Sequence, residues 1–489
     1  MPDSFEHMPA FAIRMPNGAL TSLAGNIDPH HEVAVADLIL VQHNIRQTVE
    51  RLLAELQPDV VGLSIMTFQR RTAQKICELI RASRPAARIV VGGYDPSLAP
   101  EVYACASPLT VDFIVRGEGE ACFSELLRVL ENGGAYGQVA GLCFREGDQF
   151  IQNPARPARA LDDIKLPRRS ARVLTGYTIL GRPIDVIETS RGCTYDCSFC
   201  SIIEMRGRNF YTFSIDRVLA DIRDARDHGA RTIFIVDDNI MLNVRRFEQL
   251  CQAIIDAGLN GLEYFVQAMT SSIAKHGATL APLMRRAGFK YAFLGIENIL
   301  EEDLKFLRAS AKNTRREAGG QKQNATVQAI QWLHRNGIWV VGGLIVGNPS
   351  DTRRSIQANL DFAKRHVDWP YIQHPTPYPG TPMTKDFEER DLVDSRAMEE
   401  YDGTTAVVRS EHLSCEEIEF LRWKAERWMK LRHFPRAFFH DPLFVFGHGK
   451  QMLGHTFRGS SWKSFLGLED EHAVFARYKA IRQAERSYL

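Results

Sequence analysis

The sequence predicts an α/β protein built from three successive parts. A Rossmann-like (flavodoxin-like) domain comes first, a partial TIM-type (β/α)6 barrel follows, and a mostly helical region ends the chain. Short apolar runs alternate with amphipathic helix patterns over residues 11–130, and the same alternation restarts at Ile184. Beyond residue 385 the strand patterns stop and long helix patterns replace them. Strand–helix alternation is typical of parallel sheets covered by helices on both faces.

The first domain is expected over residues 1–140 and a linker rich in Pro, Arg and Asp over residues 141–180. The linker includes a predicted hairpin at residues 141–150 (GLCFREGDQF). In sheets of this kind, ligands bind beyond the carboxyl ends of the strands. The expected strands are His31–Leu40, Val60–Ile65, Ala87–Gly93 and Val111–Val115, and the expected helices are Ile45–Leu56 and Thr72–Ala82.

The second part, residues 181–384, is predicted to be the barrel. Six strands suit an incomplete parallel barrel better than a closed eight-fold one, and barrel active sites lie at the carboxyl ends of the strands. The expected strands are Pro183–Glu188, Thr232–Val236, Glu263–Ala268, Tyr291–Ile296, Trp339–Val346 and Tyr371–Pro375. Helix patterns between them are clearest over Asp216–His228 and Arg246–Ala257.

The last part, residues 385–489, has helix patterns over Cys415–Arg432 and Glu469–Tyr488. Between them, residues 433–459 (HFPRAFFHDPLFVFGHGKQMLGHTFRG) interleave aromatic and basic side chains. One interpretation is a helical cap over the open side of the barrel. The other is a surface that binds an apolar substrate or touches a membrane.

The overall charge is balanced, with 60 Lys and Arg against 59 Asp and Glu. This balance argues against bulk electrostatic binding of nucleic acid. No run of 18 apolar residues occurs, so no transmembrane segment is predicted. The first residues have no apolar core of signal-peptide length, and a cytoplasmic location is expected.

Three cysteines, Cys193, Cys197 and Cys200, follow one another with the spacing C-x3-C-x2-C. A disulfide framework is excluded because the number is odd and nothing marks the chain as secreted. A structural zinc site takes four ligands, typically as two C-x2-C pairs, and no second pair occurs. Fully ligated [4Fe–4S] clusters take four cysteines, so three leave one iron open. The spacing therefore predicts a [4Fe–4S] cluster whose open iron binds a substrate or cofactor.

In its context (ETSRGCTYDCSFCS, residues 188–201), this motif resembles that of the radical S-adenosylmethionine enzymes, over residues 185–385. The resemblance implies that the open iron chelates S-adenosylmethionine, which is split to a 5′-deoxyadenosyl radical. An electron donor such as flavodoxin or ferredoxin is then the expected partner. The residues expected to bind S-adenosylmethionine are Phe199, Asp237, Asp238, Gln267, Gly295, Glu297 and Gly347.

These residues have distinct implied roles and local alternatives. Asp237 and Asp238 would accept hydrogen bonds from the ammonium group of S-adenosylmethionine, and Glu297 would bind its ribose. Helix capping is the alternative for all three carboxylates. Gln267 would meet the methionine part or the ribose, or be an ordinary strand-end amide. Tyr378, in the stiff loop TPYPGTP, is the candidate catalytic residue, with a purely structural turn as its alternative.

The N-terminal segments QPDVVGLSIMTFQ, RPAARIVVGGYDPS and VDFIVRGEGEACFSELL resemble the cobalamin-binding domain that precedes many radical S-adenosylmethionine domains. No G-x-G-x-x-G follows a strand, so a dinucleotide site is not supported. A degenerate domain that no longer binds cobalamin is the alternative. The residues expected to bind cobalamin are Ser64, Met66, Thr67, Arg70, Gly92, Gly93, Tyr94, Pro96, Gly117, Glu118, Gly119 and Glu120.

The chain departs from this family in one motif. Many cobalamin domains offer cobalt a histidine from D-x-H-x-x-G, but Asp28-Pro29-His30-His31 lacks the glycine. The expectation is base-off cobalamin without a protein histidine ligand. Its lower face is then left to water, to nothing, or to a residue near Thr67–Arg71.

The resemblances imply a cobalamin-dependent radical S-adenosylmethionine methyltransferase. It would methylate an unactivated carbon through a 5′-deoxyadenosyl radical and methylcobalamin. The alternative is a cobalamin-associated radical cyclase or rearrangement enzyme without methyl transfer. A non-catalytic corrinoid-binding or iron–sulfur protein is the third hypothesis. The expected substrate is a small molecule or peptide, and the aromatic C-terminal stretch favours an apolar one.

Overall fold

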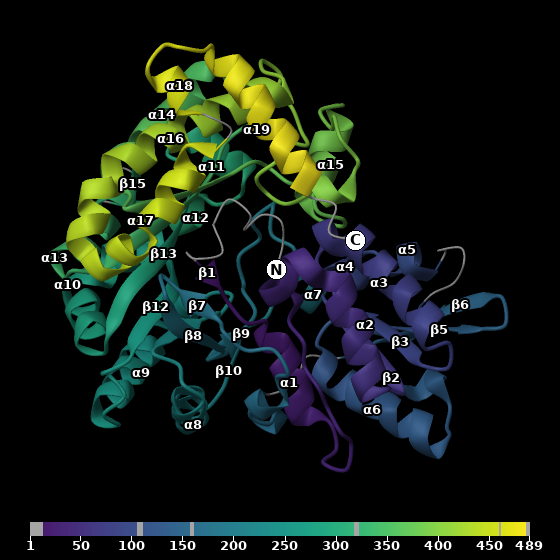
Figure 1. The fold of residues 1–489 in the computed structure, drawn as a ribbon. Coiled ribbons are helices and arrows are strands. Elements are labelled where there is room, and N and C mark those ends of the chain that lie inside the picture. Colours follow the sequence, from purple (N-terminus) through teal and green to yellow (C-terminus); the bar gives the residue numbers. More distant parts are fainter. Residues whose placement is uncertain (1–12, 105–110, 157–160, 317–321, 459–460, 486–489) are drawn as a thin grey trace.

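The computed structural model describes residues 13–104, 111–156, 161–316, 322–458 and 461–485. Two sheets organise the described chain, one of five strands and one of eight. In Figure 1 the N-terminal α/β unit lies to the right, the barrel to the left, and the C-terminal helices above. The predicted α/β class with a partial barrel and a helical C-terminus is confirmed.

The N-terminal sheet has the order β2-β3-β4-β5-β6. Its first three strands are parallel, and the predicted hairpin adds two antiparallel strands at one edge. The five strands are β2 (Val60–Ser64), β3 (Arg88–Gly92), β4 (Phe113–Val115), β5 (Leu142–Glu146) and β6 (Gln149–Gln152). The main helices around them are α2 (Ile45–Leu56), α3 (Arg70–Ser83) and α6 (Gly119–Asn132). The linker hairpin therefore belongs to this sheet.

The predicted strand His31–Leu40 is wrong. Val35 forms one isolated bridge with Arg172, and the chain then turns into the 3-10 helix η2 (Leu38–Asn44). Asp37 explains the turn, because its carboxylate accepts hydrogen bonds from the backbone N–H groups of Ile39 (3.2 Å) and Asn17 (2.8 Å). A carboxylate that bonds nearby backbone competes with strand pairing.

The barrel sheet has the order β1-β7-β8-β11-β12-β13-β16-β17. The six predicted barrel strands are confirmed, and neighbours pair in parallel. They are β8 (Arg182–Ile187), β11 (Thr232–Ile235), β12 (Glu263–Met269), β13 (Phe289–Glu297), β16 (Trp339–Ile345) and β17 (Trp369–Gln373). The outer helices are α8 (Ile215–Asp227), α9 (Val244–Asp256), α10 (Thr270–Arg286), α13 (Thr326–Arg335) and α14 (Arg353–His366).

The start of the described chain belongs to the barrel sheet. Strand β1 (Ile13–Arg14) pairs antiparallel with β7 (Thr178–Ile179), which pairs antiparallel with β8. Figure 1 shows purple β1 beside β7 at the centre of the molecule. The chain therefore touches the barrel before it forms the N-terminal sheet. The domain limits at residues 140, 180 and 384 stay predictions.

Aromatic rings fill the interior of the barrel near the amino ends of its strands. Phe234 and Phe265 face each other on adjacent strands, and their rings stack with centroids 4.5 Å apart. Phe265 in turn lies opposite Tyr291. Ile13 and Ile39 join this cluster from the N-terminal segment. The resulting apolar floor, made of Phe234, Phe265, Tyr291 and their packed neighbours, closes this end of the barrel.

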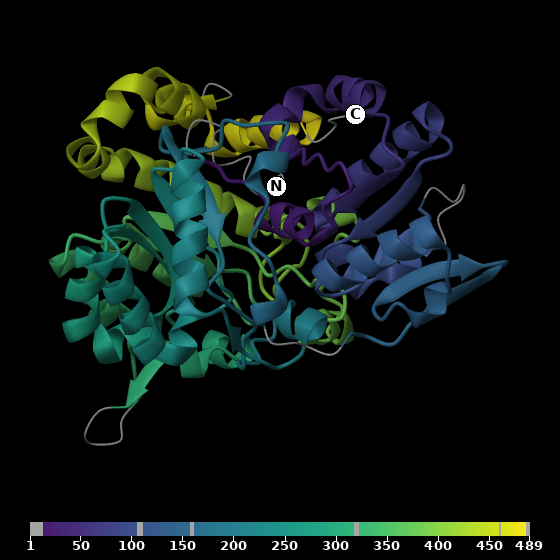
Figure 2. The same ribbon diagram turned by 90° about the horizontal axis from the view of Figure 1, so that it is seen from below.

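The C-terminal helices pack on the outside of the barrel (Figures 1 and 2). The predicted helix Cys415–Arg432 is part of α16 (Cys415–His440), and α17 (Pro442–Thr456) follows. The predicted last helix corresponds to α19 (Glu471–Glu485), while residues 486–488 lie outside the described residues. No helix among the described residues is long and apolar enough to cross a membrane.

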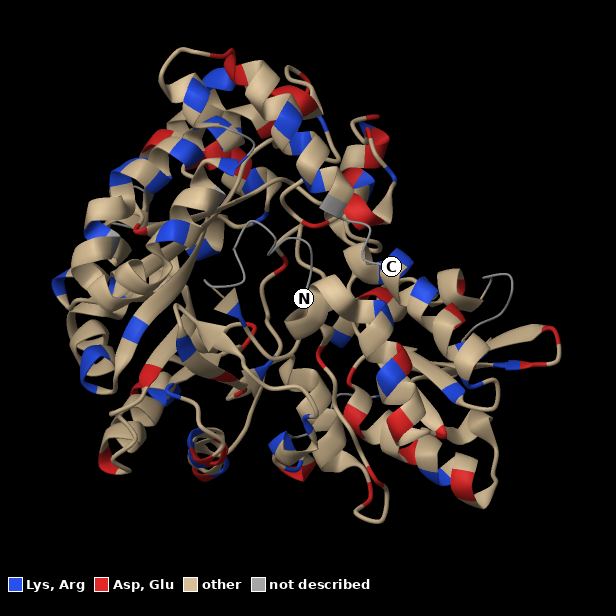
Figure 3. Cartoon of the chain, in the orientation of Figure 1, with Lys and Arg blue, Asp and Glu red and all other residues tan. Residues whose placement is uncertain are grey.

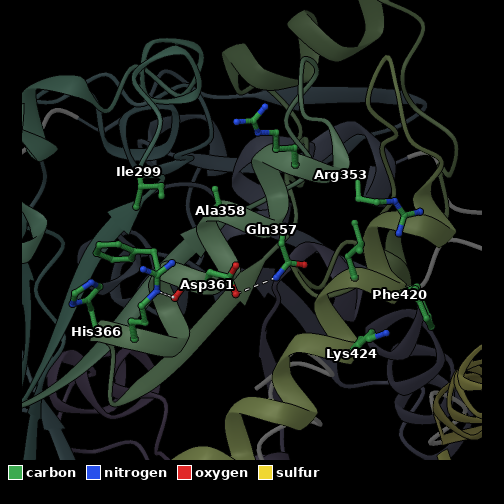
Figure 4. Close-up of a pocket in the computed structure, with 12 residues that line it drawn as sticks. Ile299, Arg353, Gln357, Ala358, Asp361, His366, Phe420 and Lys424 are labelled. Carbon is green, nitrogen blue, oxygen red and sulfur yellow. Dashed lines mark hydrogen bonds between the residues drawn. The ribbon is translucent and has the colours of Figure 1, made fainter. Parts of the chain in front are cut away.

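An open groove of about 940 Å³ lies between α14 and α16. Charged side chains line much of it, including Arg353, Asp361 and Lys424 (Figure 4). Gln357 donates a hydrogen bond to Asp361 across one turn of α14 (3.2 Å). None of the residues expected to bind a cofactor lines this groove.

Candidate active site

The three cysteines lie on a loop between β9 (Ser190–Arg191) and α7 (Ile202–Arg206), referred to below as the cluster loop. Cys193 and Cys197 are buried, and Cys200 is half-buried. The backbone N–H of Ser198 donates to the carbonyl of Leu307 (3.0 Å), and its own carbonyl accepts from the N–H of Met383 (2.9 Å). These bonds hold the loop from both sides.

The sulfur donors fit a cluster better than a single ion. A lone zinc with bonds of about 2.3 Å would draw its sulfur ligands to roughly 3.8 Å from one another. Among the described residues, ligand atoms that gather in threes within 4.8 Å occur only at His30, His31 and Glu131. Burial raises the pKa of the Cys197 thiol to about 12. Loading of the site must therefore displace thiol protons.

Lys312 is a neighbour of the cluster loop that the sequence analysis missed. It lies on α12 (Ser310–Asn313), and its Nζ is 5.7 Å from the centre of the Tyr195 ring. Burial lowers the pKa of Lys312, but the charges of Cys197 and Glu297 outweigh it and hold that pKa above its usual range. Lys312 thus brings positive charge to a site lined by thiols and a carboxylate. Nothing in the polar stretch around it signalled this role.

Glu297 ends β13 in a strained conformation. Its φ is +56°, and the pairing of β13 with β16 shifts register between Gly295 and Glu297. A Cβ on Gly295 would lie 2.6 Å from Oε1 of Glu297, so the glycine makes room for the carboxylate. Burial raises the pKa of Glu297, which Lys312 opposes. Backbone strain of this kind clusters at functional sites.

The adjacent acids Asp237 and Asp238 point to different partners. Asp237 is buried and accepts hydrogen bonds from the Thr189 N–H (2.6 Å) and the Ser190 hydroxyl (2.6 Å). It braces the chain that leads into the cluster loop. Asp238 accepts from the backbone N–H of Gly192 (2.7 Å). Neither acid caps a helix here, and their contact with S-adenosylmethionine stays a prediction.

Three further expected residues lie around the same end of the barrel. Gln267 is half-buried on β12, two residues beyond Phe265 of the apolar floor. Phe199 and Tyr378 are partly buried side chains of one cluster that also contains Cys197. Burial raises the pKa of Tyr378, so its hydroxyl keeps its proton at neutral pH. Their predicted roles remain predictions.

Two residues follow the last two barrel strands. Gly347 donates its N–H to Asp351 (2.8 Å) and follows β16. His374, which the sequence analysis did not single out, follows β17 and is only 2% exposed. Its Nδ1 lies 3.0 Å from the carbonyl of Val346, while its buried Nε2 has no hydrogen-bond partner in the described structure. Burial lowers the pKa of His374 to about 3, so the ring is neutral.

The loops expected to bind cobalamin lie together at the carboxyl ends of β2, β3 and β4. The N–H of Asp95 donates to the carbonyl of Ile65 (3.1 Å), and the N–H of Gly117 donates to Ser97 Oγ (3.0 Å). Gly93 has φ +95°, and a Cβ there would lie 2.8 Å from the backbone nitrogen of Ile65. The loops thus form a close-packed backbone cradle, which suits a large flat ligand.

Several expected cobalamin ligands already have protein partners. Arg70 forms a two-fold ion pair with buried Asp95 (2.7 and 2.8 Å). Glu120 accepts from the Ser22 hydroxyl (2.7 Å) and pairs with Arg191 (2.7 Å). The other members are Ser64, Met66, Thr67, Gly92, Tyr94, Pro96, Glu118 and Gly119, at the same strand ends. All remain predicted contacts.

The histidines of the incomplete motif lie elsewhere. His30 is 3.1 Å from Glu131, near the last residue of α6, whereas Glu118 and Glu120 lie at its first turn. A helix of 14 residues separates these ends by about 20 Å. This position agrees with cobalamin without a protein histidine, although the base-off state stays a prediction.

The loops expected to bind cobalamin and the cluster loop face each other across the two halves of the molecule. Arg206, at the end of α7, lies 3.3 Å from Glu118 and 3.9 Å from Asp238. Burial raises the pKa of Tyr94, and the charges of Asp238 and Cys200 raise it further. Residues expected to hold different cofactors therefore share one interface.

Comparison with known proteins agrees with this division. A model of the B12 binding domain matches residues 14–127, and a model of the radical SAM superfamily matches residues 187–363. An uncharacterized methyltransferase of Pyrococcus horikoshii is 26% identical over 90% of this chain and 92% of its own. The hopanoid C-3 methylase of Methylococcus capsulatus is 27% identical over 88% of this chain and 80% of its own.

Solved structures share the fold. The methyltransferase TsrM from Kitasatospora setae, with cobalamin and a [4Fe–4S] cluster bound, gives a TM-score of 0.61 at 19% identity over 77% of this chain and 76% of its own. OxsB, with aqua-cobalamin and S-adenosylmethionine bound, gives 0.63 at 18% identity over 99% of this chain and 70% of its own. The chain therefore combines a B12 binding domain with a domain of the radical SAM superfamily, and its cofactors are a [4Fe–4S] cluster, S-adenosylmethionine and cobalamin.

Proposed function

We propose that this enzyme is a methyltransferase that methylates an unactivated carbon of a small molecule or peptide. The observation that carries the proposal is the shared interface of the two predicted cofactor sites, where Arg206 contacts both Glu118 and Asp238. When bound, the three cofactors together supply a substrate radical and a methyl donor. A methyl group can pass to the substrate only if these sites are adjacent.

The residues of the chain would position and shield the reactants. Cys193, Cys197 and Cys200 hold the cluster, and Glu297 and Lys312 offer charges of opposite sign beside it. Cys193 and Cys197 are buried and the other three groups are half-buried, so electrostatic interactions among them are stronger than in water. Arg191 and Arg206 bridge the halves through Glu120 and Glu118. This bridge would fix the distance between the two cofactor sites.

The relatives favour methyl transfer without naming one substrate. Besides the hopanoid methylase they include a bacteriochlorophyllide d C-8(2)-methyltransferase of Chlorobaculum tepidum, 22% identical over 84% of this chain. A cyclase is the second candidate. The anaerobic magnesium-protoporphyrin IX monomethyl ester cyclase of Synechocystis sp. is 30% identical over 62% of this chain and 61% of its own.

The test uses anaerobic, reconstituted enzyme with a flavodoxin or ferredoxin as the electron donor, the expected cytoplasmic partner. Candidate substrates are incubated with S-adenosylmethionine labelled on its methyl group, and the masses of the products are measured by mass spectrometry. Labelled carbon in the substrate, with 5′-deoxyadenosine formed alongside, supports the proposal. Formation of 5′-deoxyadenosine with an altered substrate that never carries the label would establish the cyclase or rearrangement instead.

A further inference from the structure

Helix α17 exposes large apolar side chains along its outer face. Leu443, Phe446 and Leu453 are 83%, 75% and 50% exposed, and Phe439 at the end of α16 is 83% exposed. The spacing of the three α17 residues places them on one side of the helix. We call these four residues the apolar ridge. The helix has 15 residues with one lysine and no acidic side chain.

The opposite face of α17 is packed against the barrel. Val445 is only 5% exposed, and the rings of Phe444 and His448 border Gly181 in the turn between β7 and β8. Helix α17 therefore carries apolar side chains on both faces, and the residues that the structure describes cover only one of them. A helix that is apolar all round is normally buried, and exposed apolar patches mark interaction sites.

Basic side chains lie close to the apolar ridge along the chain. Residues 430–458 contain five Lys or Arg and a single acid, Asp441, whereas the whole chain is nearly neutral. Asp441 is buried and paired with Arg182 (2.6 Å). Arg432, Arg436 and Lys450 are exposed and form no ion pair with any residue that the structure describes. In Figure 3 the ribbon of the C-terminal half of α16 and of α17 is mostly tan with blue segments.

From this combination we propose that the apolar ridge and its basic rim dock the enzyme on an anionic lipid bilayer. Interfacial helices bury Phe and Leu below the headgroups while Lys and Arg meet the negative charge. A second copy of the chain fits less well. A two-fold interface places the same surface on both sides, so Arg432, Arg436 and Lys450 would face their own like charges without an acid to pair them.

The apolar ridge lies at the amino ends of the barrel strands. Gly181 precedes β8, and His440 of α16 stacks on Trp339, the first residue of β16, with ring centroids 3.8 Å apart. The cluster loop lies at the opposite end of the barrel. Docking would therefore leave the cofactor interface uncovered. The inference goes beyond the proposed methyl transfer and needs neither cofactor nor substrate.

The experiment is co-sedimentation of the full chain with lipid vesicles. The probes are vesicles of phosphatidylcholine alone and of phosphatidylcholine mixed with anionic phosphatidylglycerol. We expect binding to the mixed vesicles, weakening at high salt, and at least about tenfold weaker binding to the neutral ones. The ridge variant F439S/L443S/F446S and the rim variant R432Q/R436Q/K450Q should each lose about tenfold or more.

A matched control changes exposed apolar residues elsewhere, as L56S/V327S on α2 and α13, and should bind like the parent. Circular dichroism checks that each variant is folded. Absence of binding to anionic vesicles, equal binding to neutral ones, or a folded ridge variant that binds normally would each overturn the proposal. So would a lipid-free dimer in analytical ultracentrifugation that the ridge variant abolishes. The cofactor content of each variant is measured separately by absorption. Loss of vesicle binding can therefore be distinguished from loss of the cofactors.

Discussion

The two ends of the barrel are filled by different kinds of side chain. At the amino ends of the strands, Phe234, Phe265 and Tyr291 pack ring against ring. At the carboxyl ends, Asp237 and His374 are buried and Glu297 is half-buried. Burial of such polar groups costs free energy unless they are paired. The apolar end therefore contributes stability, and the burial of polar groups at the other end lowers it.

This contrast predicts which property of the enzyme a substitution at each end of the barrel should change. Changes at the carboxyl ends should alter cofactor binding or chemistry with a small effect on stability. Changes in the apolar floor should lower stability and leave the chemistry of the folded enzyme intact. Each prediction below tests one side of this division.

The largest expected effect belongs to the cluster loop. Cys197→Ser removes one of three sulfur ligands, so iron should be lost and cleavage of S-adenosylmethionine should fall about a thousandfold or more. Iron analysis and 5′-deoxyadenosine formation measure this under anaerobic conditions. Cys415→Ser, a half-buried cysteine far along the chain, is the control and should keep its iron. A Cys197→Ser enzyme that keeps its full iron content and activity would contradict the assignment of Cys197 as a ligand of the cluster.

The apolar floor should show the opposite pattern. Phe265→Ala deletes a ring that stacks on Phe234 and is 7% exposed. The free energy of unfolding should fall by about 3–5 kcal/mol, the cost of a large cavity. Denaturant titration measures this, and the affinity of the folded variant for S-adenosylmethionine should stay near that of the parent. Normal stability with lost affinity would erase the distinction between the two ends.

The sequence foretold the regular parts of the molecule because their patterns are local. Six barrel strands, the hairpin and the cysteine loop follow from periodicity and spacing alone. The prediction of a strand at His31–Leu40 was wrong because of Asp37. Its carboxylate accepts a hydrogen bond from the backbone N–H of Asn17, which is too distant in the sequence for a local pattern to reveal. Lys312 and His374 escaped notice for the same reason. Their importance arises from partners such as Glu297 and Val346 that only the tertiary fold brings near.

His374 makes the polar end sensitive to pH. Burial lowers the pKa of His374 from 6.5 to about 3 in the folded chain. Below pH 6.5 the unfolded chain therefore binds a proton at this residue that the folded chain does not, so the free energy of unfolding falls as pH falls. Between pH 6.5 and about 4 this loss should reach about 3 kcal/mol. His374→Asn keeps a donor for the Val346 carbonyl but cannot titrate. Unfolding measured across this range should therefore depend less on pH in His374→Asn than in the parent.

An exposed histidine serves as the control for this measurement. His43→Asn changes a side chain on the surface and should reproduce the parent's pH dependence. If His374→Asn also follows the parent, another group must cause the acid destabilisation, and the neutral buried ring would have no measurable energetic role.

The smallest expected effect tests the strained end of β13. Gly295→Ala places a Cβ 2.6 Å from Oε1 of Glu297, so the carboxylate must shift away from its position beside Lys312. If Glu297 binds the ribose of S-adenosylmethionine, the KM for that cofactor should rise about 10- to 100-fold with a small change in stability. Gly261→Ala is the matched control, because nothing lies within 4 Å of a Cβ there. An unchanged KM in Gly295→Ala would show that the site tolerates the shift of the carboxylate and that the position of Glu297 does not determine the affinity for the cofactor. In that case the strain at Glu297 would have to serve another contact at the carboxyl end, and the division between a stabilising floor and a strained cofactor-binding end would lose its sharpest example.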